Sequence, residues 1–256
     1  MTEAATRAFI RPRAYVRVKG PDAADLLQRI VSNDVLAGES CEALILTPKG
    51  RVIAPLLVWH RGENDFLLLT EPELGEPVRV HLTRMRFASR CEIEVEEHVS
   101  AIVFGEAEGI PTRDYGEPAV EVLDPAVLPD PLDDSIERLR ILARTPRWGR
   151  EIDDGILPAE AGLDTRAISF TKGCYPGQEP LARLHNRGHV NRTLRVVEFA
   201  NDIRAHQADE VRHDGVSVGR VTSAVPGLAL AYVRVEVPVG AVLEVAGHPA
   251  RLRSSS

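Results

Sequence analysis

From Thr193 onward the sequence changes to short β-rich runs separated by glycine and proline, and this pattern constrains the fold more than any other feature. Short strand-forming runs bounded by turn residues are typical of small all-β domains. The expected strands are Leu194–Phe199, Glu210–Arg212, Ser217–Ser223, Gly227–Val235 and Val242–Ala246. We therefore expect residues 193–256 to form a small C-terminal β-barrel, with the final serines disordered.

The first 192 residues combine strand-like and helical patterns. Alternating or continuous apolar runs predict strands, and apolar residues at helical spacing predict helices. The expected strands are Tyr15–Val18, Cys41–Thr47, Arg51–His60, Phe66–Thr70, Cys91–Val95, Ser100–Phe104 and Glu121–Leu123. The expected helices begin near Asp22, near Pro77, at Asp133 or Asp134, and at Ala159. The turn Pro48–Gly50 joins two of the strands into a hairpin, so the pattern predicts an α+β protein with an antiparallel sheet.

The composition limits the classes of partner. The formal net charge is -7 at pH 7, which disfavours non-specific binding to nucleic acid. The three cysteines, Cys41, Cys91 and Cys174, form no C-x-x-C pair. This spacing argues against a disulfide framework or a self-contained zinc site and favours a reducing compartment. The sequence shows neither a secretory signal pattern nor an apolar stretch of membrane-spanning length, so we expect a cytoplasmic protein without a membrane partner.

The segment Lys172–Glu179 holds the densest cluster of unusual residues. Gly173 and Gly177 flank Cys174 and Tyr175, and glycine lets the backbone approach a ligand closely or adopt a positive φ. The neighbouring lysine is expected to lower the pKa of the Cys174 thiol. The alternative is a glycine-rich turn around a buried cysteine, because free cysteine is usually a core residue.

This segment resembles the K-G-C-[aromatic]-x-G-Q-E signature of the YgfZ family of folate-binding proteins, which are relatives of the glycine-cleavage T protein. Gly20–Val35 is similar to the N-terminal helix signature of both groups, and Gly219–Val233 resembles the superfamily's C-terminal barrel. The resemblance implies an α+β, T-protein-like fold with ferredoxin-like lobes, followed by the barrel. It also implies that Cys174 is a reactive thiol with a redox-related role or a role in iron–sulfur transfer.

The resemblance further implies that the cofactor is tetrahydrofolate or a one-carbon derivative. A carboxylate can bind the donor–acceptor edge of a pterin, and Glu121 resembles the pterin-binding glutamate of the T protein. Arg140 resembles the superfamily arginine near the folate. The alternatives are a solvated strand charge for Glu121 and an exposed helix residue for Arg140. The other residues expected to contact the cofactor are Lys172, Gly173, Tyr175, Gly177, Gln178, Glu179 and Arg183.

Two positions depart from the superfamily pattern. Arg144 stands where glycine is usual. Pro55 aligns with the T-protein aspartate that interacts with the reactive folate nitrogens, and proline can neither accept a proton nor bind an amine. A general acid or base contributes typically about 10²–10⁴-fold to the rate, so Pro55 disfavours efficient aminomethyl transfer.

A basic cluster follows the Cys174 segment. Arginine suits bidentate recognition of carboxylate or phosphate, so the cluster could hold a glutamate tail or an RNA phosphate run; scattered surface charges are the alternative. His185 and His189 have the spacing of a helical metal pair, but no third ligand accompanies them and we expect no metal site. The cluster consists of Arg183, His185, Arg187, His189, Arg192 and Arg195.

The leading hypothesis is a tetrahydrofolate-binding accessory protein that supports iron–sulfur cluster assembly or repair, with iron–sulfur client or assembly proteins as partners. A folate-dependent aminomethyltransferase or other one-carbon transferase is the alternative. Binding of tRNA is a third hypothesis, which the net charge of -7 disfavours. We expect the ligand in a central cleft between residues 1–192 and 193–256, with Cys174 on a loop near it.

Overall fold

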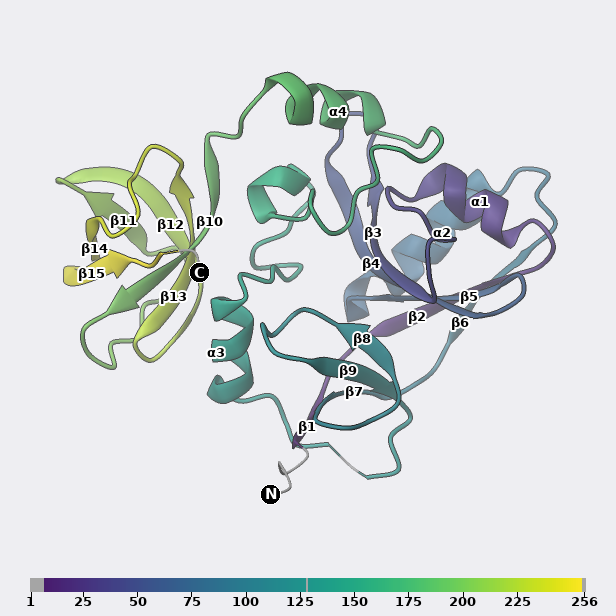
Figure 1. The fold of residues 1–256 in the computed structure, drawn as a ribbon, viewed down its shortest axis with the longest axis horizontal. Helices are drawn as coiled ribbons and strands as arrows, with labels where there is room; N and C mark the ends of the chain where they lie inside the picture. Colours follow the sequence, from purple (N-terminus) through teal and green to yellow (C-terminus); the bar gives the residue numbers. More distant parts are fainter. Residues whose placement is uncertain (1–6, 128, 255–256) are drawn as a thin grey trace.

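The computed structural model describes residues 7–127 and 129–254. The chain forms two antiparallel sheets and a closed barrel, with the barrel at one end and the larger sheet at the other (Figure 1). The predicted α+β fold with a C-terminal barrel is therefore confirmed. The disorder expected for the serine tail concerns Ser254, which is exposed and outside any helix or strand, and Ser255 and Ser256, which lie outside the described residues.

The larger sheet has five strands in the order β3-β4-β5-β2-β6. Helix α1 (Ala23–Ile30) and helix α2 (Gly75–Met85) supply apolar side chains to its core. Leu26, Leu27 and Ile30 recur at helical spacing and are buried in the same cluster as the strand residues, as expected for an amphipathic helix on a sheet. The strands are β2 (Ala14–Lys19), β3 (Ser40–Leu46), β4 (Val52–Gly62), β5 (Asp65–Thr70) and β6 (Glu92–Glu96).

The smaller sheet has four strands in the order β1-β7-β9-β8. Ile110 packs with Leu57 and Leu69 in a cluster that joins the two sheets. The strands are β1 (Arg7–Ile10), β7 (Ser100–Phe104), β8 (Ile110–Thr112) and β9 (Ala119–Leu123). The sequence pattern did not predict β1 or β8, because both are short and their strand geometry depends on pairing with β7 and β9.

The barrel closes in the order β10-β13-β12-β11-β14-β15. Its last strand was not predicted, because a proline and two charged or polar side chains obscure the apolar alternation of the segment. Pairing with β14 and β10 makes it a strand and closes the barrel. The strands are β10 (Arg192–Phe199), β11 (Glu210–His213), β12 (Val216–Val225), β13 (Leu228–Arg234), β14 (Val242–Val245) and β15 (His248–Leu252).

The segments between sheets and barrel carry the remaining helices. Helix α3 (Asp134–Leu142) begins at Asp133, whose carboxylate accepts hydrogen bonds from two backbone N–H groups, as predicted for an N-cap. Helix α4 (Gln178–Arg187) was not predicted, since basic residues and Pro180 dominate its sequence. Two short 3₁₀ helices, η1 (Pro72–Leu74) and η2 (Pro158–Ala161), complete the fold. Within the described residues, no helix has the length and apolarity needed to cross a membrane.

Candidate functional site

A small cavity of about 60 Å³ lies where the two sheets meet the segment after α3. We call it the inner cavity. Charged side chains and apolar strand residues share its wall. The lining residues are Arg11, Arg13, Glu42, Pro55, Leu56, Leu57, Glu71, Pro111, Thr112, Asp114, Thr145, Pro146, Ile152, Leu163 and Arg166.

Ion pairs organise the charged part of this wall. Arg11 Nη2 lies 2.7 Å from Glu71 Oε1, and Arg11 Nη1 lies 3.1 Å from Glu71 Oε2. Arg166 bridges Glu42 and Asp114. Burial alone would raise the pKa of Glu71, but the charge and hydrogen bonds of Arg11, together with the charges of Arg13 and Arg147, hold that pKa below its ordinary value. A paired carboxylate keeps free lone pairs, so these groups retain capacity to accept hydrogen bonds from a ligand.

Glu121 does not face the inner cavity. Its side chain is completely buried behind Arg13, which donates to both carboxylate oxygens at 3.0 and 2.9 Å. Ser100 Oγ donates a further hydrogen bond at 2.5 Å. Arg13 thus occupies both oxygens of the Glu121 carboxylate, and a direct contact between Glu121 and a pterin stays a prediction. Glu121 instead fixes Arg13, which does line the cavity.

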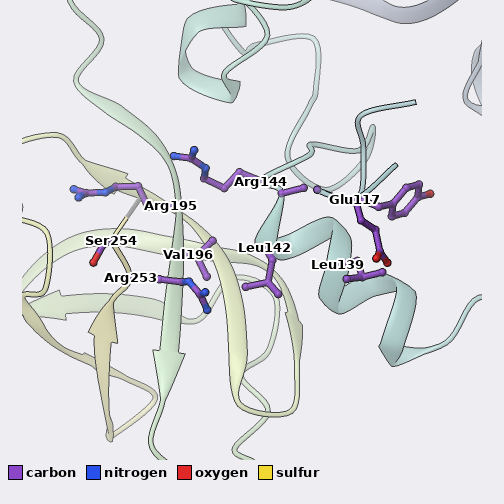
Figure 2. A pocket seen from close by; sticks show the side chains of 11 residues that line it. Glu117, Leu139, Leu142, Arg144, Arg195, Val196, Arg253 and Ser254 are labelled. Carbon is purple, nitrogen blue, oxygen red and sulfur yellow. The ribbon is translucent and has the colours of Figure 1, made fainter. Parts of the chain in front are cut away.

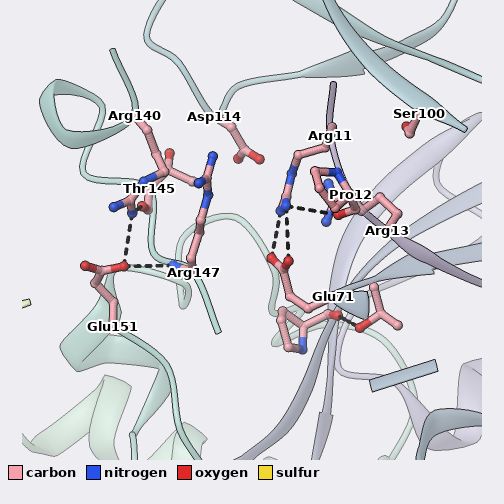
Figure 3. Close-up of polar contacts among 12 residues, drawn as sticks. Arg11, Pro12, Arg13, Glu71, Ser100, Asp114, Arg140, Thr145, Arg147 and Glu151 are labelled. Carbon is pink, nitrogen blue, oxygen red and sulfur yellow. Dashed lines mark hydrogen bonds and ion pairs between the residues drawn. The ribbon is translucent and has the colours of Figure 1, made fainter. Parts of the chain in front are cut away.

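Arg140 is also an internal structural residue. Its side chain is 1% exposed, and all three guanidinium nitrogens donate to protein acceptors on Glu137, Glu151 and the Thr145 carbonyl. Glu151 in turn accepts from Ser223 Oγ at 2.7 Å, so the network ties α3 to the barrel. Figure 3 shows the Arg140–Glu151 and Arg11–Glu71 pairs as separate groups. Four of the five N–H donors of the Arg140 guanidinium are engaged within the protein, and its contact with folate stays a prediction.

Two buried donors near the cavity have no partner among the described residues. They are Arg11 Nε and Arg147 Nη2. Burial, together with the charges of Arg11 and Arg140, lowers the pKa of Arg147. An unsatisfied buried donor costs about 1–3 kcal/mol, so both atoms favour an acceptor that water or a ligand would bring. The edge of a pterin presents both hydrogen-bond donors and acceptors. It therefore needs carboxylates that accept hydrogen bonds and guanidinium groups that donate them.

Pro55 occupies a specific place in the cavity wall. It lies in β4 opposite Leu44 of β3, just beyond the region where β4 pairs with β5. Proline lacks a backbone N–H and is tolerated where no ladder bond is needed. Thr70 Oγ1 donates to the Pro55 carbonyl at 2.8 Å. The carboxylates in the described cavity lining are Glu42, Glu71 and Asp114, and each is paired with arginine.

A larger cavity of about 540 Å³ adjoins the inner one and shares Pro146 and Arg166 with it. We call it the outer cavity. It lies between the segment after α3, η2 and the start of the barrel. Its other lining residues are Ala143, Arg144, Ala159, Glu160, Ala161, Gly162, Thr165, Thr193, Leu194, Arg195 and Val235. The two cavities thus lie next to each other between the sheets and the barrel.

The Cys174 loop lies elsewhere. Cys174 is exposed, whereas Cys91 is buried and Cys41 is half-buried. Burial raises the pKa of the Cys41 thiol to about 11. Cys174 lines neither the inner nor the outer cavity, so its expected place beside the ligand cleft stays a prediction. The loop leads into α4 at the top of the view in Figure 1, away from β9, which carries Glu121.

Three residues of the predicted cluster hold this loop in place. Lys172 Nζ donates to the carbonyls of Val31 and Asn33 at 2.7 and 2.9 Å. Desolvation lowers the Lys172 pKa to about 8, and the charge of Lys172 acts on Cys41, where it opposes the effect of burial on the thiol pKa. Gly177 has φ +83 and sits against the Thr47–Gly50 turn. Tyr175 is buried, and its hydroxyl donates to the Ser169 carbonyl at 3.1 Å.

The remaining predicted residues lie on the loop or on α4. No neighbouring atom lies within 4 Å of a Cβ built on Gly173. Gln178 is the first residue of α4, and Glu179 pairs with Arg183 on its exposed face. No residue of the Lys172–Glu179 segment lines the inner or outer cavity, and neither does Arg183, whereas Arg195 of the basic cluster lines the outer cavity. His185 stacks on Phe170 with ring centroids 4.2 Å apart, and both line an apolar cavity of about 340 Å³ beside α4.

The sequence analysis did not identify the charged residues that line the inner cavity. Charged side chains within or beside apolar strands were the available signal, as in Cys41-Glu42-Ala43 and in Glu71 directly after Phe66–Thr70. Such residues need a partner when buried. Their partners come from remote segments: Arg11 and Glu71 are 60 positions apart. A single sequence gives no signal of which remote charged residues form a pair.

Sequence comparison places the chain near two groups of proteins. Residues 192–256 match the family described as CAF17, C-terminal beta-barrel domain. The chain is 27% identical to the mitochondrial iron–sulfur cluster assembly factor IBA57 homolog of Pyricularia oryzae, across 94% of this chain and 74% of that protein. It is 26% identical to human mitochondrial IBA57, across 75% of this chain and 65% of that protein. It is 24% identical to an aminomethyltransferase of Nostoc, across 91% of this chain and 76% of that protein.

Structure comparison identifies the fold. The glycine cleavage system aminomethyltransferase T of Bartonella henselae superposes with a TM-score of 0.83. The match covers 99% of this chain and 86% of that chain at 17% sequence identity. The chain is thus similar in sequence to IBA57-type iron–sulfur cluster assembly factors, has the fold of the aminomethyltransferase, and ends in a barrel that matches the CAF17 C-terminal family.

Proposed function

We propose that the chain is a tetrahydrofolate-binding protein of the YgfZ type that supports assembly or repair of iron–sulfur clusters in other proteins. One observation carries the proposal: the inner cavity keeps a polar, arginine-rich wall, yet Pro55 stands where the T protein is expected to have its aspartate. The names of the fungal and human relatives, which are iron–sulfur cluster assembly factors, support the second half of the proposal.

Folate would use both cavities. The pterin would lie toward the inner cavity, where Glu42, Glu71 and Asp114 can accept hydrogen bonds and Arg11 can donate. Ligand pockets usually measure roughly 300–1,000 Å³, whereas the inner cavity measures about 60 Å³. Binding therefore requires the cavity to widen, and the rest of the ligand would occupy the outer cavity of about 540 Å³.

Cys174 would act on the cluster, which is the cargo of the protein. An exposed thiol can supply one ligand, and iron–sulfur clusters usually have four protein ligands. Among the described residues, no group of three or more His, Cys, Asp or Glu side chains could hold a metal ion. The remaining ligands would therefore come from a partner protein or a small thiol. A cytoplasmic location belongs to the proposal, although the names of the fungal and human relatives give a mitochondrial location for those proteins.

Complementation tests this function. Cells that lack the chain receive the wild type, Cys174→Ser or Thr112→Trp, the last of which places a bulky side chain at the inner cavity, and the activity of an iron–sulfur enzyme is measured. Cys91→Ala is the matched control, because it removes a buried thiol. We expect the wild type and the control to restore activity and the other two variants to fail at equal protein levels. Full activity with Cys174→Ser would contradict the proposal.

A one-carbon transferase is the second candidate, and Glu42 is the observation that favours it. Leu44 pairs with Pro55 and Glu42 pairs with Leu57, so Glu42 lies on the same sheet face as Pro55. Burial raises the Glu42 pKa against the opposing effect of Arg166. A transfer assay with 5,10-methylenetetrahydrofolate separates the two functions. Turnover by the wild type that Glu42→Gln abolishes would establish the enzyme, and the accessory function predicts no turnover.

A further inference from the structure

Helix α4 borders a cavity that the proposed function does not use. It measures about 340 Å³, within the range of roughly 300–1,000 Å³ that is usual for small-molecule pockets. We call it the α4 cavity. Segments that are remote in the sequence build its wall together: η2 with the chain that follows it, α4 with the residues just after its end, and the end of β13.

Apolar side chains form most of the wall of the α4 cavity. Ile168 and Leu181 are buried, whereas Phe170 and Leu184 are half-buried and keep part of their surface in water. A ligand with an apolar body would remove this surface from water, which is favourable. The apolar lining residues are Ile168, Phe170, Leu181, Leu184, Val190 and Val235.

A cavity beside the barrel shows a contrasting wall. It measures about 280 Å³, and Figure 2 shows Glu117, Arg195 and Arg253 among the side chains that line it. In the α4 cavity the titratable lining residues are Asp164, His185 and His189. An apolar wall with a few polar groups is typical of pockets that bind small organic molecules.

An aromatic pair forms one part of the wall. The ring centroids of Phe170 and His185 lie 4.2 Å apart, and the ring planes meet at 21°, so the two rings stack. A further aromatic ring can pack on this pair in an offset or edge-to-face arrangement. The face of a phenylalanine ring also attracts a cation. This part of the wall therefore suits a ligand that combines an aromatic ring with a positive charge.

Asp164 determines the preferred charge of the ligand. Its half-buried carboxylate lines the α4 cavity and forms no hydrogen bond or ion pair with the described residues. A carboxylate that is partly removed from water favours a cationic partner. His185 and His189 can each accept a hydrogen bond from an ammonium group through a neutral imidazole. The arginines of the basic cluster are absent from the described lining of this cavity.

We propose that the α4 cavity binds a small aromatic amine, with the ring against Phe170 and the ammonium group on Asp164. Phe170 precedes the Cys174 loop and α4 follows it, so the ligand would contact both ends of this loop. The proposal is independent of the folate function. The α4 cavity shares Ala159 and Val235 with the outer cavity, and its described lining shares no residue with the inner cavity.

Calorimetric titration with three probes of one shape tests the site. Naphthylmethylamine carries a cation, naphthylmethanol is neutral and naphthoate carries an anion on the same ring. We expect the wild type to bind the amine about tenfold more tightly than the alcohol, because an ammonium group forms charge-assisted hydrogen bonds with a carboxylate. The anion should bind more weakly than the alcohol, because Asp164 repels it.

Two variants and a matched control locate the binding. Asp164→Asn should lower the affinity for the amine to that for the alcohol and leave the alcohol unchanged. Leu184→Trp should abolish binding of the amine and the alcohol, because the larger side chain fills the cavity. Asp154→Asn should bind all three probes like the wild type, since Asp154 is exposed and outside the described lining of these cavities.

Three results would overturn the proposal. They are absence of amine binding to the wild type at millimolar concentration, equal affinity of the wild type for the amine and the alcohol, and a preference for the amine that survives in Asp164→Asn. Circular dichroism establishes that each variant is folded. Asp164→Asn alters a half-buried residue outside the helices and strands, so it keeps the test decisive even where Leu184→Trp does not fold.

Discussion

The Arg13 guanidinium forms two parallel hydrogen bonds with the Glu121 carboxylate, at 3.0 and 2.9 Å, directly behind the wall of the inner cavity. The Glu121 side chain is completely buried and that of Arg13 is 9% exposed. Burial lowers the Arg13 pKa, but Glu121 raises it more, so Arg13 is charged at every accessible pH. Removing one partner would leave the other charge buried without compensation.

Glu121→Gln should therefore destabilise the protein strongly. Breaking a buried pair costs about 3–5 kcal/mol, and for a chain of this size roughly 10 °C in Tm follows. Thermal unfolding of the variant measures the loss. Glu117→Gln is the matched control, because the Arg7–Glu117 pair is exposed and such pairs contribute about 0–1 kcal/mol. If both variants lower Tm by similarly small amounts, the Arg13–Glu121 pair does not stabilise the wall of the inner cavity.

His98 should make the stability depend on pH. It bridges Glu96 at 2.9 Å and Asp124 at 2.7 Å, and so links β6 to the end of β9. Burial lowers the His98 pKa, but the two carboxylates raise it more, to above its ordinary value of 6.5. A raised folded-state pKa stabilises the fold fully below the unfolded pKa, and this stability is lost as pH rises through the folded pKa. Urea unfolding between pH 5.5 and 8.5 should show that loss in the wild type and a flatter profile in His98→Gln. If the stability of both proteins changes with pH in parallel, the His98 bridge is not the source of the pH dependence.

Gly177→Ala should disturb the start of α4. Gly177 has φ +83, and an added Cβ would lie 2.6 Å from the Thr47 carbonyl oxygen and 3.0 Å from Gly50 Cα. Steric strain at a positive φ adds to this clash, and we expect a loss of about 2 kcal/mol. Gly173→Ala is the control in the same loop, since open space surrounds that position, and should change stability by less than about 0.5 kcal/mol. Chemical denaturation measures the free energy of unfolding of both variants. Equal losses in Gly177→Ala and Gly173→Ala would contradict the close packing of Gly177 against Thr47 and Gly50.

Arg144→Gly should raise the stability. Glycine relieves the left-handed strain at φ 57, which we expect to contribute about 0.5–1 kcal/mol, or about 1–4 °C in Tm. Arg138→Gly, in the interior of α3, should instead lower the stability by about 1 kcal/mol. Differential scanning calorimetry compares the two variants. A destabilised Arg144→Gly would mean that contacts of the arginine outweigh its backbone strain.

Cys174 should be the fast-reacting thiol of the native protein. It is exposed, whereas burial raises the pKa of both Cys41 and Cys91, and thiolate is the reactive form. Titration with a chromogenic disulfide should give one fast equivalent and two more after denaturation. Cys174→Ser should remove the fast phase. A fast phase that persists in this variant would place reactivity at another cysteine.

Local patterns predicted much of the fold. The continuous apolar run of Phe66–Thr70 and the capping carboxylate of Asp133 specify their elements without help from remote residues. The strand β8 and helix α4 were missed because pairing and packing, not periodicity, define them. The barrel was predicted from its turns, although its closing strand was not.

The candidate site was less predictable than the fold. Pro55 was identified from the resemblance and lines the inner cavity. Glu121 and Arg140 were predicted as ligand contacts. In the structure both form buried ion pairs, with partners that sequence spacing does not reveal. Arg11 and Glu71 were missed for the same reason, since a pair 60 positions apart leaves no local signal.

The most direct test of the proposed function is an anaerobic calorimetric titration of tetrahydrofolate into the wild type and Thr112→Trp. Thr112 lines the inner cavity and is half-buried, so tryptophan there should block the cavity without entering the core. We predict micromolar binding to the wild type that falls at least tenfold in the variant, equivalent to about 1.4 kcal/mol. Absence of binding to the wild type, or undiminished binding to a folded Thr112→Trp, would contradict a folate site in the inner cavity.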